Sequence, residues 1–143
     1  MGARGRMTSI ALLRQMIKPA AQVALDVRGN KASVELHEPQ APDSKLRIRG
    51  LPAETIVIKI DCFPSPDALF GCHSGECKRA DYAIVAASEK KRRILYLELK
   101  RTKADHSDVV KQLQRARCVM LYCEQIASAF RAIASTAANI WRT

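Results

Sequence analysis

The most constraining feature of the sequence is a pair of apolar runs, residues 79–87 and 94–100, on either side of one short polar segment. Both runs carry apolar residues at odd and even positions alike, as strands do when both of their faces are covered. The polar segment between them, residues 88–93, has a length that connects two antiparallel strands. The pattern therefore predicts a buried β-hairpin around which the rest of the chain must fold.

A turn centred on residues 89–90 fixes which residues of the two strands face each other, and it places Asp81 opposite Glu98. Side chains alternate between the two faces of a strand, so Glu98 and Lys100 project from one face and Leu99 from the other. Two carboxylates on a buried hairpin repel each other strongly unless a cation lies between them. Oxygen ligands without an accompanying His or Cys favour Mg²⁺ or Mn²⁺ over Zn²⁺.

Apolar residues recur at helical spacing near both ends of the chain. The first helix is expected from Thr8 to about Val27, with a split or kink at Pro19. A long helix is expected from Asp105 onward, where a single apolar stripe repeats at helical spacing. The Ala-rich residues 127–143 indicate that this helix continues as a helical tail.

Two further strands complete the expected sheet. Residues 55–62 are rich in β-branched side chains and predict a largely buried strand, and a short edge strand is expected near residue 34. Prolines and polar residues indicate a loop at 38–44 and a long irregular connection at 63–78. We therefore expect an α/β fold in which a central mixed sheet of four strands is flanked by helices, with one domain spanning residues 1–143.

The residues of the hairpin and of the following helix resemble the PD-(D/E)XK nuclease superfamily, also called restriction-endonuclease-like. The resemblance covers about residues 9–126, including the order of the helices and strands, and it leaves 127–143 outside the core. Ala80 stands where many superfamily members have a proline before the aspartate. The motif itself is carried by four residues at the superfamily's spacing: Asp81, Glu98, Lys100 and Gln112.

The resemblance implies a Mg²⁺- or Mn²⁺-dependent nuclease that hydrolyses phosphodiester bonds in nucleic acid, with DNA as the favoured substrate. It implies that Asp81 and Glu98 hold the cation together with the backbone carbonyl of Leu99. Lys100 would orient or help to deprotonate the attacking water, and Gln112 would flank the site. The superfamily often adds an acidic ligand from the N-terminal region, for which three candidates stay open: Asp26, Glu35 and Glu38.

The charge of the chain favours a polyanionic partner. Lys and Arg number 24 against 14 Asp and Glu, a net charge of +10, and residues 78–103 alone hold nine basic and three acidic residues. Arg79, Arg101 and Lys103 lie nearest the expected site and are the candidates for binding nucleic acid. The basic run at 90–93 lies at the far end of the hairpin, where a solvated turn is the alternative. Aromatic residues make up only 5%, which argues against a surface that stacks on bases.

Two other functions are compatible with the same residues. A nuclease-fold subunit could bind nucleic acid without turnover, or act only inside a complex. Alternatively, a basic structural domain could carry an ion-pair network at the end of its hairpin. Because the chain is small, sequence specificity would require a homodimer or a partner protein.

The five cysteines form an odd set in a chain large enough to fold without disulfides. They indicate free thiols in a reducing compartment, so we expect a cytoplasmic protein. The alternative is a structural Zn²⁺ in the loop before Asp81, although the spacing of its four ligands matches no standard zinc finger: Cys62, Cys72, His73 and Cys77. No apolar run approaches the ~18 residues that span a bilayer, so we expect no membrane segment.

Overall fold

A computed structural model describes residues 9–38, 41–78, 80–88, 91–99 and 106–140. The strands form two three-stranded antiparallel sheets, with strand orders β1-β2-β3 and β4-β5-β6. Short 3-10 turns follow α1 and β4, and a third lies at Pro66–Ala68 in the long loop before β5. In chain order, the helices and strands are α1 (Ile10–Met16), β1 (Asp26–Arg28), β2 (Lys31–Glu38), β3 (Ala41–Pro52), β4 (Thr55–Lys59), β5 (Tyr82–Ser88), β6 (Lys91–Leu97) and α2 (His106–Ile140).

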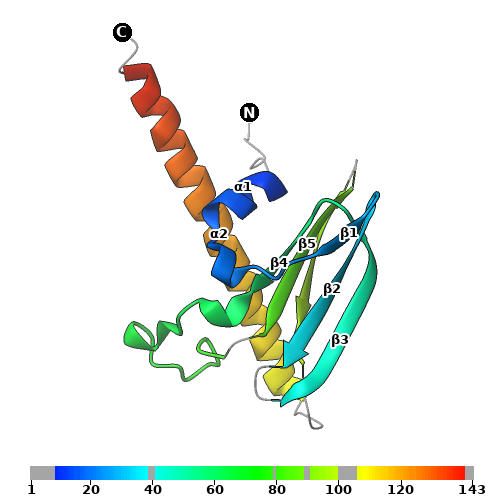
Figure 1. The fold of residues 1–143 in the computed structure, drawn as a ribbon. Coiled ribbons are helices and arrows are strands. Elements are labelled where there is room, and N and C mark those ends of the chain that lie inside the picture. The colour runs from blue at the N-terminus through cyan, green and yellow to red at the C-terminus, as the bar shows by residue number, and fades with distance from the viewer. Residues whose placement is uncertain (1–8, 39–40, 79, 89–90, 100–105, 141–143) are drawn as a thin grey trace.

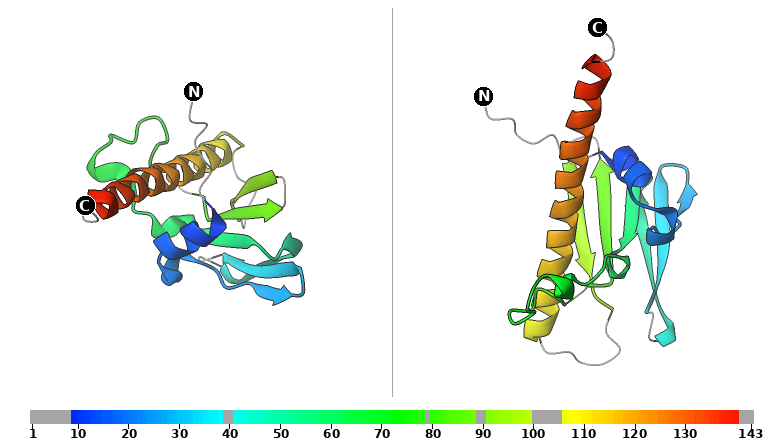
Figure 2. Two further views of the ribbon diagram at one scale, coloured as in Figure 1. Left: turned by 90° about the horizontal axis from the view of Figure 1, so that it is seen from above. Right: turned by 90° about the vertical axis from the view of Figure 1, so that its left-hand side faces the viewer.

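The β4-β5-β6 sheet forms the middle layer of the molecule. Helices α1 and α2 cover one of its faces, and the β1-β2-β3 sheet covers the other (Figures 1 and 2). Alternate residues of β5 therefore pack in different cores: Ala83 and Val85 pack against the helices, whereas Tyr82 and Ile84 pack against the second sheet. The prediction of a hairpin buried on both faces is confirmed for β5, with a sheet rather than a helix on one side.

The core between the helices and the middle sheet follows the helical spacing seen in the sequence. Helix α1 contributes Ile10 and Leu13, and α2 contributes Ala116, Val119 and Met120, all of them buried. Burying a large aliphatic side chain of this kind stabilises the fold by about 1.5–3 kcal/mol. The apolar stripe predicted for the long helix is therefore the face that holds α2 to the sheet.

Helix α1 is much shorter than predicted. Ser9 caps its N-terminus by accepting a hydrogen bond from the backbone N–H of Leu12 at 3.1 Å, and the helix ends at Met16. A proline disfavours helical backbone in the residue before it, so the helix cannot continue through Lys18, and Pro19 begins a separate 3-10 turn. The split expected at Pro19 is confirmed, but the helix does not resume, and Val27 lies in strand β1 instead.

The prediction of one mixed sheet of four strands is wrong, because residues 26–52 build a sheet of their own. The segment expected to be a short edge strand near residue 34 is β2, the central strand of that sheet. The prediction of a loop at 38–44 is also wrong, since β3 already begins at Ala41. Pro42 fits there because β3 is an edge strand, whose outer N–H groups need no partner in the sheet.

Helix α2 runs without interruption over 35 residues. Its C-terminal part extends past the end of the sheets, as Figure 2 shows. The helical tail predicted from residue 127 is confirmed as far as Ile140, the last residue described. No helix within the described part of the chain combines the length and apolar character needed to cross a membrane.

Two tyrosines should make the stability of the fold depend on pH in the alkaline range: Tyr82 of β5, which is buried, and Tyr96 of β6, which is partly buried. Burial raises the pKa of both Tyr82 and Tyr96 above the ordinary value of 10.0. Their contribution is therefore complete below pH ~10, where neither state ionises, and is lost as the pH rises further, because the unfolded chain ionises first. We expect the urea concentration at the midpoint of unfolding to be lower at about pH 11 than at about pH 9. The difference between the two pH values should be smaller in Tyr82→Phe than in the wild type. An equal fall in both proteins would contradict this assignment.

Candidate functional site

The register of the β5–β6 hairpin is the one expected from a turn at residues 89–90. The pairs run from Ser88 with Lys91 to Tyr82 with Leu97. Beyond the last pair, the backbone N–H of Asp81 donates to the carbonyl of Leu97 at 3.1 Å. This hydrogen bond departs from the register of the preceding pairs, so the ladder ends at Tyr82 and Leu97, and the predicted pairing of Asp81 with Glu98 stays a prediction.

Asp81 is held in place by hydrogen bonds from two neighbouring strands. Its backbone carbonyl accepts a hydrogen bond from the N–H of Ile60, just after β4, at 3.0 Å. Its carboxylate Oδ2 accepts one from the backbone N–H of Leu99, just after β6, at 2.8 Å. The side chain of Leu99 packs in the core between the two sheets, which fixes the backbone at this point. Asp81 therefore meets the Glu98–Leu99 segment directly.

Glu98 lies on the face of the middle sheet that α2 covers. Its Oε1 accepts a hydrogen bond from the side-chain Nε2 of Gln112 at 3.3 Å, and its Oε2 is buried. The Oε1 of Gln112 is also buried, and no described residue donates a hydrogen bond to it. Gln114, two residues further on, is exposed. Gln112 and not Gln114 is therefore the glutamine of this helix that contacts Glu98.

The remaining predicted site residues cannot be placed. Lys100, Arg101 and Lys103 follow Leu99 directly, and Arg79 precedes Ala80, but all four lie outside the described residues. The predicted roles of Lys100 in catalysis and of the other three in binding nucleic acid stay predictions.

The three candidates for an additional acidic ligand separate clearly. Asp26 and Glu35 form ion pairs with basic residues of the β1-β2-β3 sheet, away from the site. Burial raises the pKa of Tyr82, the residue after Asp81, and the charges of Asp81, Asp61 and Glu38 add to this effect, so Glu38 is the candidate whose charge acts at this end of β5. The sequence did not indicate Asp61 as a further acidic residue close to Asp81. The pairing of β4 with β5 could have found it, since Lys59 is opposite Tyr82 and the chain then continues beside Asp81.

The donors at the site are oxygens: two carboxylates, a buried amide oxygen and the nearby backbone carbonyls. Such a set suits Mg²⁺ or Mn²⁺. Among the described residues, no three His, Cys, Asp or Glu side chains are grouped so that they could hold a metal ion. A cation here would therefore rest on Asp81 and Glu98 with backbone oxygens.

The prediction that every cysteine is a free thiol is wrong for one pair. Cys72 and Cys77 form a disulfide within the loop before Asp81, with their Cα atoms 5.3 Å apart. Gly75 and Cys72 both have positive φ angles, 87° and 63°, and turn the loop back on itself. Cys62 is a free, exposed thiol. In this state the disulfide leaves only Cys62 and His73 of the four residues considered for zinc.

Comparison of the chain with protein-family models, with curated proteins and with solved structures finds no match.

Proposed function

We propose that this protein is a divalent-metal-dependent nuclease of the PD-(D/E)XK type that hydrolyses phosphodiester bonds in DNA. One observation carries the proposal: at one end of the β5–β6 hairpin Asp81 contacts the backbone of Leu99, and Glu98, the residue before Leu99, contacts Gln112. They come from three separate segments, and their spacing along the chain resembles that of the motif. An incidental ion pair at a hairpin end does not need a glutamine from the following helix.

The electrostatics of the pair support a cation. Asp81 and Glu98 are partly buried, and the carboxylate of Asp81 contacts the backbone of Leu99, the residue after Glu98, so their negative charges repel in a medium that screens them less than water does. A divalent ion between the carboxylates offsets this repulsion. When bound there, Mg²⁺ would polarise the scissile phosphate and lower the pKa of a coordinated water.

The protein's own residues would then have distinct tasks. Asp81 and Glu98 hold the ion, together with the carbonyl of Leu99. Gln112 fixes the rotamer of Glu98 through the hydrogen bond at 3.3 Å. Lys100, which the sequence predicts on the same strand face as Glu98, would orient the attacking water and stabilise the negative charge that develops on the phosphate.

A second function is favoured by the open edge of the middle sheet. β6 lies at that edge, and within the described residues no strand pairs with its free side. After Gln112 the chain continues as one helix to Ile140 instead of returning to the sheet. A partner that adds a strand to β6 would complete the sheet, which fits a nucleic-acid-binding subunit that cleaves only inside a complex.

Cleavage assays on supercoiled, linear duplex and single-stranded DNA distinguish these functions. With Mg²⁺ or Mn²⁺ the wild type should yield products that disappear in EDTA, and neither Asp81→Ala nor Lys100→Ala should yield any. The Lys100→Ala variant should still bind DNA, because it loses the chemistry and keeps most of the charge. A wild type that shifts DNA on a gel but cleaves none of the three forms would refute the nuclease and leave the binding subunit.

A further inference from the structure

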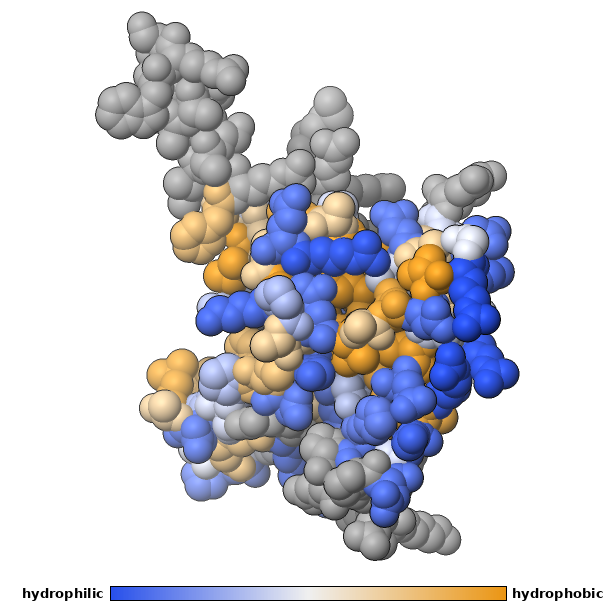
Figure 3. All heavy atoms as spheres, in the orientation of Figure 1, coloured by the Kyte–Doolittle hydropathy of each residue, from blue (hydrophilic) through white to orange (hydrophobic). Residues whose placement is uncertain are grey.

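The outer face of the β1-β2-β3 sheet is basic and open to solvent. In β2 and β3 the side chains alternate: Ala32, Val34 and Leu36 are buried against the middle sheet, and the residues between them point outward. In Figure 3 hydrophilic side chains gather along the side of the molecule that these strands occupy. The outward side chains of the three strands include Asp26, Glu35, His37 and five basic residues, which are Arg28, Lys31, Lys45, Arg47 and Arg49.

One end of this face is hollowed into an open groove of about 450 Å³. Asp26 is the one carboxylate among the side chains that line it. It faces four basic ones, so the groove carries a net charge of +3: Arg28, Lys31, Arg47 and Arg49. A concave surface with this excess of positive charge attracts an anion.

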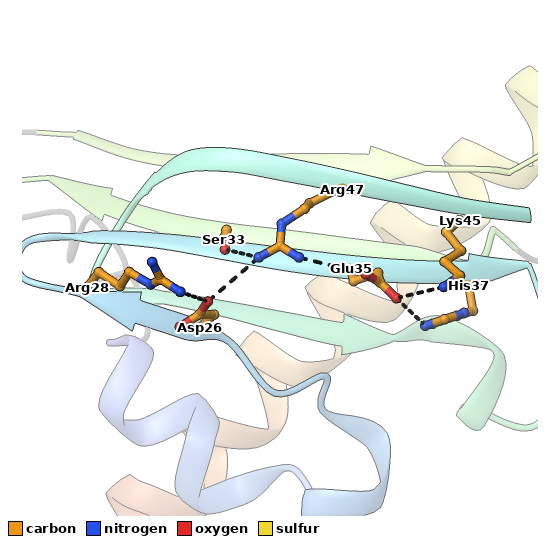
Figure 4. A network of polar contacts seen from close by, with 7 residues as sticks. All are labelled: Asp26, Arg28, Ser33, Glu35, His37, Lys45 and Arg47. Atoms are coloured by element: carbon orange, nitrogen blue, oxygen red, sulfur yellow. Dashed lines mark hydrogen bonds and ion pairs between the residues drawn. The ribbon is translucent and has the colours of Figure 1, made fainter.

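Ion pairs hold part of this charge in a fixed arrangement, drawn in Figure 4. The guanidinium of Arg47 lies between Asp26, at 3.6 Å, and Glu35, at 3.8 Å, and it also contacts Ser33. Lys31 and Arg49 form no ion pair with any residue that the structure describes. The acidic residues thus orient Arg47, while Lys31 and Arg49 keep their full charge available.

The basic residues continue from the groove toward the site. Lys45, Arg47 and Arg49 follow each other on one face of β3, about 6.8 Å apart by strand geometry. At the far end of this row Lys45 pairs with His37, whose carbonyl accepts a hydrogen bond from the hydroxyl of Tyr82 at 2.6 Å. Tyr82 is the neighbour of Asp81. A row of evenly spaced positive charges fits a linear polyanion better than a compact one.

We propose that this groove and the row leading from it bind the phosphate backbone of DNA, as an anchoring surface separate from Asp81 and Glu98. The side chains involved are arginine, lysine, aspartate and serine, without an aromatic ring, so binding here would not depend on base sequence. The choice of DNA rests on the proposed function. The binding itself does not require cleavage or a metal ion.

The test is the affinity for a labelled DNA duplex, measured in EDTA over a range of salt concentrations. The groove variant is Arg47→Gln/Arg49→Gln. The control is Lys91→Gln/Arg93→Gln, which removes the same charge from exposed positions of β6 near the far end of the hairpin. We expect the groove variant to lose about tenfold in affinity and to lower the slope of log affinity against log salt by roughly 2. The control should lose less than about threefold.

Equal losses in the two variants, or no loss in the groove variant, would overturn the proposal. So would displacement of the duplex by poly-glutamate at the same charge concentration, because that would indicate an acidic protein as the partner. If Arg47→Gln/Arg49→Gln fails to fold, Lys31→Gln/Arg49→Gln replaces it, since neither side chain is in an ion pair with a described residue.

The outcomes for the groove and for the nuclease are separable. A wild type that binds DNA through the groove but cleaves nothing refutes the nuclease alone. A wild type that cleaves DNA, with a groove variant that binds it as tightly as the control does, refutes the groove alone.

Discussion

Glu98→Gln should cleave DNA at least about a thousandfold more slowly than the wild type, which corresponds to roughly 4 kcal/mol of lost transition-state stabilisation. Glutamine has the same shape as glutamate and can still meet Gln112, so the fold should survive. It lacks the charge, however, and the carboxylate pair would keep only one of its two negative charges. The rate of plasmid cleavage in Mg²⁺ measures the loss of catalysis, and the thermal midpoint of the same sample shows whether the fold survives.

The matched control for this substitution is Glu54→Gln. Glu54 is exposed, and its backbone carbonyl accepts a hydrogen bond from the N–H of Ala87, which places it at the opposite end of the sheet from Asp81. The same chemical change there should leave cleavage unaltered. Cleavage by Glu98→Gln at a rate similar to that of Glu54→Gln would show that Glu98 is not a metal ligand.

Arg92→Met should destabilise the protein by about 3 kcal/mol, the largest effect on stability that we expect from one polar substitution. The side chain of Arg92 is only 8% exposed, and its guanidinium lies 2.6 Å from the carboxylate of Glu124 on α2. Removing the arginine leaves a largely buried carboxylate without this cation. For a chain of this length the thermal midpoint should fall by roughly 10 °C.

The double variant Arg92→Met/Glu124→Leu tests the cause of that loss. Replacing both partners by apolar side chains removes the stranded charge, so most of the lost stability should return. A double variant as unstable as Arg92→Met would point to lost packing instead. A single variant that melts within about 1 °C of the wild type would contradict the importance of the pair.

The hairpin could be predicted from the sequence because two local signals agreed. A short polar segment indicated the turn, and with it the register of the pairs from Ser88 with Lys91 to Tyr82 with Leu97. The helical spacing after the hairpin predicted the long helix, which carries Gln112 to Glu98. Both signals depend on periodicity within one element or across one tight turn, where the distance along the chain is small.

The parts that were missed depend on contacts between distant segments. The prolines of residues 38–44 indicated a loop more strongly than the alternation of Val34 and Leu36 indicated a strand. The β1-β2-β3 sheet was therefore not predicted. Arg92 was grouped with its basic neighbours as a turn, although it faces α2 as Ile94 does. The number of cysteines likewise could not show that Cys72 and Cys77 are brought together by the loop.

Binding of Mn²⁺ tests the central claim most directly, because it asks whether the end of the β5–β6 hairpin is a metal site. Calorimetric titration of Mn²⁺ into the wild type, Glu98→Gln and Glu54→Gln, each without DNA, measures metal binding without relying on turnover. We predict that the wild type and Glu54→Gln bind Mn²⁺ with equal affinity and that Glu98→Gln binds it at least about a hundredfold more weakly. Equal binding by all three proteins, or binding by none, would contradict the assignment of Asp81 and Glu98 as the metal ligands.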